Sequence, residues 1–191
     1  QVLLALKNNK NIFVEKPLAI TIEEIEEIDR AYKNIEQPPR LMVGFNRRFS
    51  PYIVRMRELL SKENEPKSVI MTINAGFIPK DHWTQDPHIG GGRIIGEACH
   101  FIDLMQYLIS KNIESCNVTS ANSKPGSKIN FDEATITLSF LDGSIGTIHY
   151  FSSGSKAFPK ERIEAFCNGG ILQLDNFRSL KGYDWNNFNA S

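Results

Sequence analysis

Residues 133–151, EATITLSFLDGSIGTIHYF, decide which class of fold the chain can adopt. In the first half, apolar residues at positions 134, 136, 138 and 140 alternate with Thr135, Thr137 and Ser139. Strict alternation is typical of a strand with one buried face. Asp142-Gly143 follows where a tight hairpin turn belongs, so the second half is predicted to return as a neighbouring strand. The stretch therefore predicts an antiparallel sheet with one packed face.

The residues around this hairpin extend the same pattern. Further strands are predicted at 67–77, 113–123 and 161–177, the last of them with a hairpin turn at Gly169-Gly170. Helices are predicted from Ser50-Pro51 to about residue 62 and from about 94 to 110. The fold class predicted for residues 49–191 is α+β, an open and mainly antiparallel sheet with helices on one face. The final residues, 182–191, show no clear element and are expected to begin a truncated segment.

Residues 1–48 show a different order of predicted elements, in which helices and strands alternate. The end of an amphipathic helix (1–10) leads into the strand NIFVEKP (11–17), and Thr21-Ile-Glu-Glu24 forms a capping box that starts the next helix. Gln37-Pro-Pro39 ends that helix, and RLMVGFNRRF (40–49) is predicted as a second strand. Helix, strand, helix and strand with short connections indicate a parallel α/β sheet. We therefore expect residues 1–48 to be the last part of a parallel α/β domain, and the chain to be cut from a longer protein.

Composition excludes several classes of function. The 191 residues are 41% apolar and 23% charged, with 22 basic and 22 acidic side chains. Zero formal charge argues against a nucleic acid or an acidic membrane as a partner. No apolar run approaches the roughly 20 residues that a membrane-spanning helix needs. Three cysteines without CxxC spacing indicate thiols in a reducing compartment, so we expect the protein to be cytoplasmic.

A glycine run stands out in PHIGGGRIIGEACHFIDL, residues 87–104. A dinucleotide-binding loop needs G-x-G-x-x-G after a strand, but the segment before Gly90 is polar and the third glycine falls at Gly96 instead of Ile95. A phosphate-binding role is therefore not expected. A zinc site is not expected either, because the scattered residues His82, His88, Cys99 and His100 include no H-x-x-x-H pair.

The helix after the glycines places Glu97, His100 and Asp103 on one face at a period of 3.6 residues. Two interpretations are open. These side chains face water as the polar side of an ordinary helix, or His100 is functional, since an imidazole transfers protons near neutral pH. Trp83, before the glycines, is a candidate for stacking on a sugar ring and equally for ordinary packing.

Three ordered segments resemble one family: VEKPLAIT at 14–21, VGFNRRFSP at 43–51 and GGGRIIGEACHFIDL at 90–104. Together they are similar to the glucose–fructose oxidoreductase, inositol dehydrogenase and rhizopine-catabolism (Gfo/Idh/MocA) family. The resemblance implies a Rossmann domain that binds NAD or NADP, followed by an α+β domain that carries a sugar-like substrate. It implies that Glu15, Lys16 and Pro17 approach the cofactor and that Lys16 lies beside nicotinamide and substrate.

The resemblance also implies an acid/base role for His100 and contacts to substrate or cofactor for Asn46 and Arg47. The family's helix commonly has an aspartate four residues before its histidine, and here that position is Gly96. Glu97 and Asp103 are the candidates to replace it. The implied reaction is hydride transfer between nicotinamide and a hydroxyl-bearing carbon of a sugar, cyclitol or nucleotide-sugar. The alternative is a non-catalytic module of the same fold that binds a sugar derivative or assembles oligomers. With either function, the open sheet predicts a homo-oligomer, a dimer or larger, with the Thr/Ser-rich face near the interface.

Overall fold

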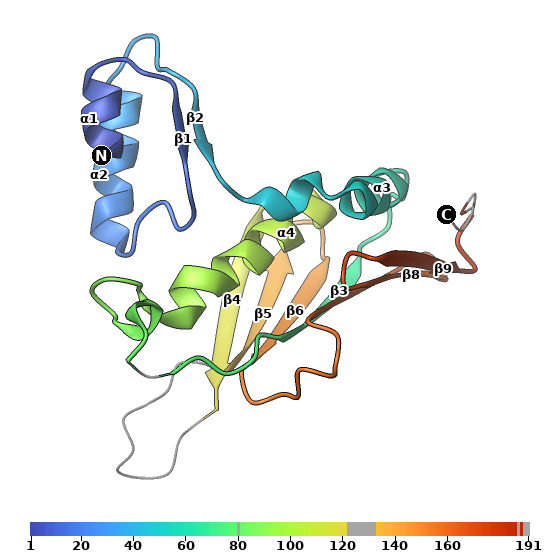
Figure 1. The fold of residues 1–191 in the computed structure, drawn as a ribbon. Coiled ribbons are helices and arrows are strands. Elements are labelled where there is room, and N and C mark those ends of the chain that lie inside the picture. The colour runs from blue at the N-terminus through green and yellow to red at the C-terminus, as the bar shows by residue number, and fades with distance from the viewer. Residues whose placement is uncertain (80, 122–132, 187, 189–191) are drawn as a thin grey trace.

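The computed structural model describes residues 1–79, 81–121, 133–186 and 188. A small N-terminal part holds α1 (Val2–Lys7), β1 (Ile12–Val14), α2 (Ile22–Lys33) and β2 (Leu41–Val43). A larger part holds a seven-stranded sheet with helices on one face (Figure 1). The α+β class predicted from the sequence is confirmed. The division into two domains near residue 48 stays a prediction.

The N-terminal part is a parallel α/β fragment. Strands β1 and β2 pair in parallel, with Phe13 opposite Met42, and the two helices lie side by side (Figure 1). The predicted capping box begins α2: the Thr21 hydroxyl accepts from the Glu24 backbone N–H, and the Glu24 carboxylate accepts from the Thr21 N–H. The first backbone N–H groups of a helix have no partner within the helix. This exchange supplies a hydrogen-bond acceptor to two backbone N–H groups, those of Thr21 and Glu24.

The strand predicted at 40–49 is too long. It ends at Val43, and residues Asn46–Phe49 form a 3₁₀ helix, η1. The Phe45 N–H donates to the Val43 carbonyl and the Asn46 N–H to the Gly44 carbonyl, at 2.8 and 2.9 Å. These local hydrogen bonds turn the chain away from an extended conformation and direct η1 toward the larger part.

The large sheet has the strand order β4-β5-β6-β3-β7-β8-β9. Neighbours are antiparallel except β3 and β6, which run parallel. The strands are β3 (Ser68–Asn74), β4 (Ile113–Ser120), β5 (Ala134–Phe140), β6 (Ile145–Phe151), β7 (Glu161–Cys167), β8 (Gly170–Asp175) and β9 (Ser179–Tyr183). The sequence did not predict β9, and the β7–β8 turn lies at Asn168-Gly169, one residue earlier than expected. Residues 122–123 of the predicted strand 113–123, and 187 and 189–191 of the tail, lie outside the described residues.

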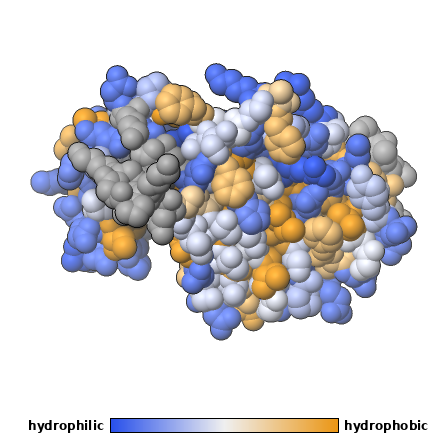
Figure 2. All heavy atoms as spheres, turned by 90° about the horizontal axis from the view of Figure 1, so that it is seen from below, coloured by the Kyte–Doolittle hydropathy of each residue, from blue (hydrophilic) through white to orange (hydrophobic). Residues whose placement is uncertain are grey.

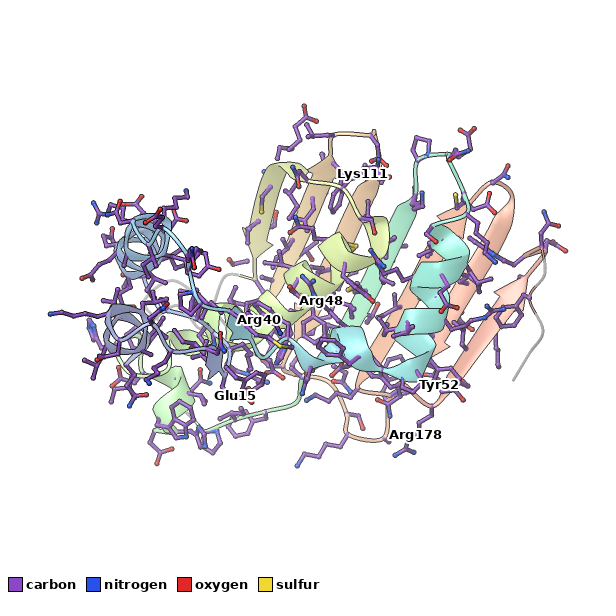
Figure 3. All side chains as sticks on the ribbon, turned by 90° about the horizontal axis from the view of Figure 1, so that it is seen from above. Glu15, Arg40, Arg48, Tyr52, Lys111 and Arg178 are labelled. Carbon is purple, nitrogen blue, oxygen red and sulfur yellow. The ribbon has the colours of Figure 1, made fainter. Side chains whose placement is uncertain are left out.

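Two helices, α3 (Pro51–Leu60) and α4 (Cys99–Ile109), cover one face of the sheet (Figure 3). The alternation predicted for β5 is confirmed, because Ile136 and Leu138 are 1% exposed and face these helices. The segment predicted as one helix at 94–110 contains two helical types: residues Ile94–Ala98 form a π-helical turn, η3, and α4 follows it. Such turns are frequent at functional sites.

The other face of the sheet is open. Figure 2 shows apolar side chains among small polar ones on this face of the molecule. A row of residues that is apolar except for Ser68 crosses neighbouring strands from β6 to β9; it consists of Ile145, Ser68, Phe166, Ile171 and Tyr183. No helix in the described part of the chain is long and apolar enough to span a membrane.

Helix α4 approaches the sheet most closely at Gly146. A Cβ added there would lie 2.6 Å from the Met105 Sδ, and Met105 is fully buried. We expect Gly146→Ala to lower the free energy of unfolding by about 1–3 kcal/mol through overpacking. In a Met105→Ala background the same substitution should cost at least about 0.5 kcal/mol less, because the colliding atoms are gone. Urea unfolding of the full-length protein measures both; equal costs in the two backgrounds would contradict this packing.

Candidate functional site

A cavity of about 350 Å³ lies where the N-terminal part meets the π-turn of the larger part. That volume is within the range of small-molecule sites. One wall comes from the segment after β1, and the other from the loop and turn that precede α4. The lining residues are Lys16, Pro17, Ile20, Ile78, Trp83, Thr84, Ile89, Gly90, Gly92, Arg93, Gly96 and Glu97.

Lys16 connects the two walls. Its Nζ donates to the Gly96 carbonyl at 2.8 Å, and the Lys16–Pro17 peptide bond is cis. An ammonium has three donors, so this contact leaves donors for a ligand in the cavity. Glu15, the preceding residue, is exposed and lies against Gly44 instead of lining the cavity.

The glycine run has a packing role. A Cβ at Gly90 would lie 2.5 Å from the Thr84 Cα, so only glycine allows this close backbone approach. Gly92 has a φ of +75°, and a Cβ there would meet no atom within 4 Å. The run therefore closes the loop on itself and leaves an open wall toward the cavity, which accounts for the glycines without a bound phosphate.

Glu97 is the centre of a hydrogen-bond network. Its Oε2 accepts from the Tyr150 hydroxyl at 2.5 Å and from the Arg93 guanidinium at 3.1 Å, and its Oε1 lies 3.5 Å from the Lys160 Nζ. Burial opposes the charge on Glu97, but the Tyr150 and Arg93 hydrogen bonds outweigh burial, and the pKa of Glu97 lies below its usual value. Glu97 is therefore ionised at neutral pH and held by three donors.

His100 lies one turn further on and is 6% exposed. Its Nδ1 is buried without a hydrogen-bond partner among the described residues, and the Phe45 ring meets it edge-on at 6.0 Å. Burial, followed by the charges of Arg47 and Lys16, lowers the pKa of His100 to about 4. His100 is therefore neutral at physiological pH; it is buried and is not among the residues that line the cavity.

Asp103 and Arg47 are held in ion pairs. Asp103 accepts both hydrogen bonds of the Arg48 guanidinium, which lies between η1 and α4 (Figure 3). Arg47 donates two hydrogen bonds to Glu161, at 2.9 and 2.6 Å. The structure thus places neither Asp103 nor Glu97 in a hydrogen bond with the Nδ1 of His100. These bidentate pairs join η1 to α4 and to β7.

The remaining candidates divide between the cavity and its surroundings. Trp83 lines the cavity and is 62% exposed, in the short 3₁₀ helix Trp83–Gln85, η2. Asn46 is exposed at the start of η1 and does not line the cavity. Sequence reasoning missed Arg93, Tyr150 and Lys160. The spacing of Arg93 four residues before Glu97 and the inward position of Tyr150 in the β6 alternation were available signals.

The cavity fits the reactive end of a nicotinamide cofactor. Its lining joins the cationic Lys16 to an open glycine wall, and the Nε of Arg93, a lining residue, is buried without a hydrogen-bond partner among the described residues. Lys16 and Pro17 are the residues that would hold the ring. Among the described residues, no group of three or more histidine, cysteine, aspartate or glutamate side chains is arranged to hold a metal ion.

Removal of the Tyr150 hydroxyl tests whether the network stabilises the charge on Glu97. A carboxyl whose pKa is lowered in the folded state stabilises that state above its unfolded pKa, and the contribution is lost as the pH falls through the folded value. Tyr150→Phe removes a donor to an ionised group, so we expect a loss of about 1–2 kcal/mol of unfolding free energy at pH 7. The difference in unfolding free energy between Tyr150→Phe and the unmodified protein should become smaller as the pH falls and Glu97 becomes protonated.

Urea unfolding of the full-length protein at several pH values measures this effect. Tyr52→Phe, on α3, serves as the matched control and should change little at any pH. A Tyr150→Phe deficit that is independent of pH would show that the hydroxyl does not stabilise the charge on Glu97.

Comparison with known proteins gives a consistent result. The GFO/IDH/MocA C-terminal domain matches residues 55–173. Myo-inositol 2-dehydrogenase from Thermotoga maritima is 23% identical over 180 residues, which cover 93% of this chain and 53% of that protein. The galactose/lactose metabolism regulatory protein GAL80 of Saccharomyces cerevisiae is 29% identical over 130 residues, 62% of this chain and 29% of that protein.

Solved structures show the same fold. An NAD-binding oxidoreductase from Klebsiella pneumoniae superimposes with a TM-score of 0.82 at 21% identity, over 97% of this chain and 54% of that one. Myo-inositol dehydrogenase from Lactobacillus casei, in complex with NAD(H) and myo-inositol, gives 0.73 at 24% identity, over 91% and 50%. The chain spans about half the length of the curated dehydrogenase relatives it matches. Because the matching domain covers more than half of the residues, the chain belongs to the Gfo/Idh/MocA family and contains that family's C-terminal domain.

Proposed function

We propose that the full-length protein is an NAD(P)-dependent oxidoreductase that transfers hydride between nicotinamide and a hydroxyl-bearing carbon of a sugar, cyclitol or nucleotide-sugar. The observation that carries the proposal is the Lys16 contact with Gly96, which places an ammonium in the same cavity as an ionised Glu97 and one turn from a neutral His100. Relatives named as inositol dehydrogenases and a neighbour bound to NAD(H) and myo-inositol support the class of reaction.

The chain's own side chains have distinct tasks in this proposal. His100, neutral at physiological pH, accepts the proton of the substrate hydroxyl during oxidation and returns it during reduction. Lys16 donates to the reacting oxygen and stabilises the negative charge that develops there. Glu97, fixed by its donors, accepts hydrogen bonds from substrate hydroxyls at the cavity wall.

The cofactor enters this scheme only as the hydride carrier. When bound, the nicotinamide ring supplies or receives the hydride. Lys16 and Pro17 line its expected position, and Glu15 lies next to them in sequence. Trp83 offers an exposed aromatic face to the substrate at the mouth of the cavity. Asn46 and Arg47, on η1, lie outside the lining residues, and we propose that a bound substrate or cofactor extends far enough to contact them.

Two substitutions test the assigned roles. In the full-length protein, Lys16→Ala is expected to lower kcat roughly 100- to 1000-fold, as for removal of one donor to a developing oxyanion. His100→Ala is expected to lower it roughly 100- to 10,000-fold, the usual contribution of a general base. Turnover is followed by NADH absorbance, with the exposed Lys111→Ala as control. Near-normal turnover in either variant, with an unchanged melting temperature, would contradict the role assigned to that residue.

The second candidate is a non-catalytic module that binds a sugar derivative. It is favoured by Gly96 at the position of the family aspartate and by the match to GAL80, a regulatory protein. The two candidates differ in one measurable respect. Reduction of NAD⁺ or oxidation of NADH by the purified full-length protein with any sugar or cyclitol excludes the non-catalytic module.

We also propose that the open sheet face joins two copies of the protein. The apolar row defined above carries no charged residue, and Phe166 and Ile145 on it are 37% and 51% exposed. The strands β4 and β5 add threonine and serine side chains beside the row. The Arg162–Glu164 ion pair lies beside the row on the same face of β7, so the charges there are paired. A partly apolar face of this kind suits contact with an identical face across a two-fold axis.

Light scattering of the full-length protein tests this interface. We expect a dimer or larger oligomer that Phe166→Asp converts to a smaller species, because a buried unpaired carboxylate is costly. Leu141→Asp, at the more exposed turn between β5 and β6, should leave the mass unchanged. A monomer at high concentration, or an oligomer insensitive to Phe166→Asp, would contradict the proposal.

A further inference from the structure

The cavity carries more positive than negative charge among the described residues. Lys16 and Arg93 line it. Lys160, in the loop before β7, does not line it, but its Nζ lies 3.5 Å from the Oε1 of Glu97, which does. Glu97 is the one carboxylate on the described wall. The chain as a whole has zero formal charge, so three cations around one carboxylate are a local concentration, not a reflection of composition.

Neighbouring acids do not balance this charge. Glu161 is committed to Arg47 by two hydrogen bonds, and together they are neutral. Asp86, in the loop that precedes the glycines, accepts from the backbone N–H groups of residues 88 and 89 and does not line the cavity.

Lys160 is the cation with the weakest attachment. Glu97 already accepts shorter hydrogen bonds from Tyr150 and Arg93, while the Lys160 Nζ lies 3.5 Å away and its side chain is 50% exposed. Its backbone is fixed, because the Lys160 carbonyl accepts from the Asn74 N–H at 2.8 Å where β7 joins β3. Lys160 therefore presents a half-exposed ammonium from a fixed backbone position beside Glu97.

We propose that the substrate bears an anionic group, a carboxylate or a phosphate, and that Lys160 is the residue that selects it. The proposal rests on the proposed function, because the anion is taken to be part of the molecule whose hydroxyl carbon reacts. Lys16 serves the reacting oxygen and Arg93 holds Glu97, which leaves Lys160 to pair with a second charge. Charge-assisted hydrogen bonds are the stronger kind, but half-exposure of Lys160 reduces the gain.

The experiment compares matched ligands with the full-length protein. Calorimetry in the presence of NADH measures binding of D-glucose, D-glucuronate and D-glucose 6-phosphate, and of D-galactose and D-galacturonate. NAD⁺ reduction is measured with the same compounds. We expect an anionic member to bind at least about 10-fold more tightly than its neutral counterpart. The uronates and the phosphate distinguish the two sources of the anion.

Variants assign the preference to Lys160. Lys160→Gln should remove most of the 10-fold difference, Lys160→Arg should retain it, and Lys156→Gln, an exposed lysine of the same loop, should leave it unchanged. Equal binding of neutral and anionic ligands, or an equal loss for both in Lys160→Gln, would overturn the inference.

The experiments can contradict the anion preference and the proposed oxidoreductase function independently of each other. Turnover of neutral sugars that is insensitive to Lys160→Gln would leave the oxidoreductase proposal intact and remove the anion preference. Binding of anions that depends on Lys160, without NAD⁺ reduction by any ligand, would keep the binding site and remove the proposed reaction.

Discussion

The burial of one face of α4 against the sheet is the interaction on which the rest of the structure depends. Gly146 lets the helix approach β6, and Phe101, Met105 and Leu108 fill the space between them. A close-packed interior fixes the position and the rotation of the helix. The π-turn just before it then directs Glu97 toward Tyr150 and leaves His100 in a dry position one turn later. The chemistry of the cavity follows from this packing.

The N-terminal part contributes one wall of the cavity and the ammonium group of Lys16. Parallel pairing of β1 with β2 fixes the direction in which the segment 15–17 leaves the sheet. Lys16 then spans the gap to Gly96, while Arg47 and Arg48 attach η1 to β7 and α4. Partly buried bidentate ion pairs constrain geometry more than they add stability. The cavity is therefore defined by contacts between segments far apart in sequence.

Local signals predicted much of the fold and part of the site. The alternation in β5, the capping box of α2 and the Asp142-Gly143 turn act through neighbours in sequence, and all three appear in the structure, while the turn predicted at Gly169-Gly170 lies one residue earlier. The π-turn was not predictable because it depends on Tyr150 and Arg93, which satisfy Glu97 from the sheet and from the same turn. Asp103 was expected near His100, yet Arg48, 55 residues away, holds its carboxylate. Such pairings arise only after the segments have packed.

The most direct test of this account is a crystal structure of the full-length protein with NAD⁺ and a substrate or inhibitor bound. The account predicts the nicotinamide and the ligand in the cavity between Lys16 and the glycine wall. It also predicts a ligand oxygen within hydrogen-bond distance of the Lys16 Nζ and of the His100 ring. A ligand bound elsewhere, with the Nδ1 of His100 still unpartnered, would contradict it.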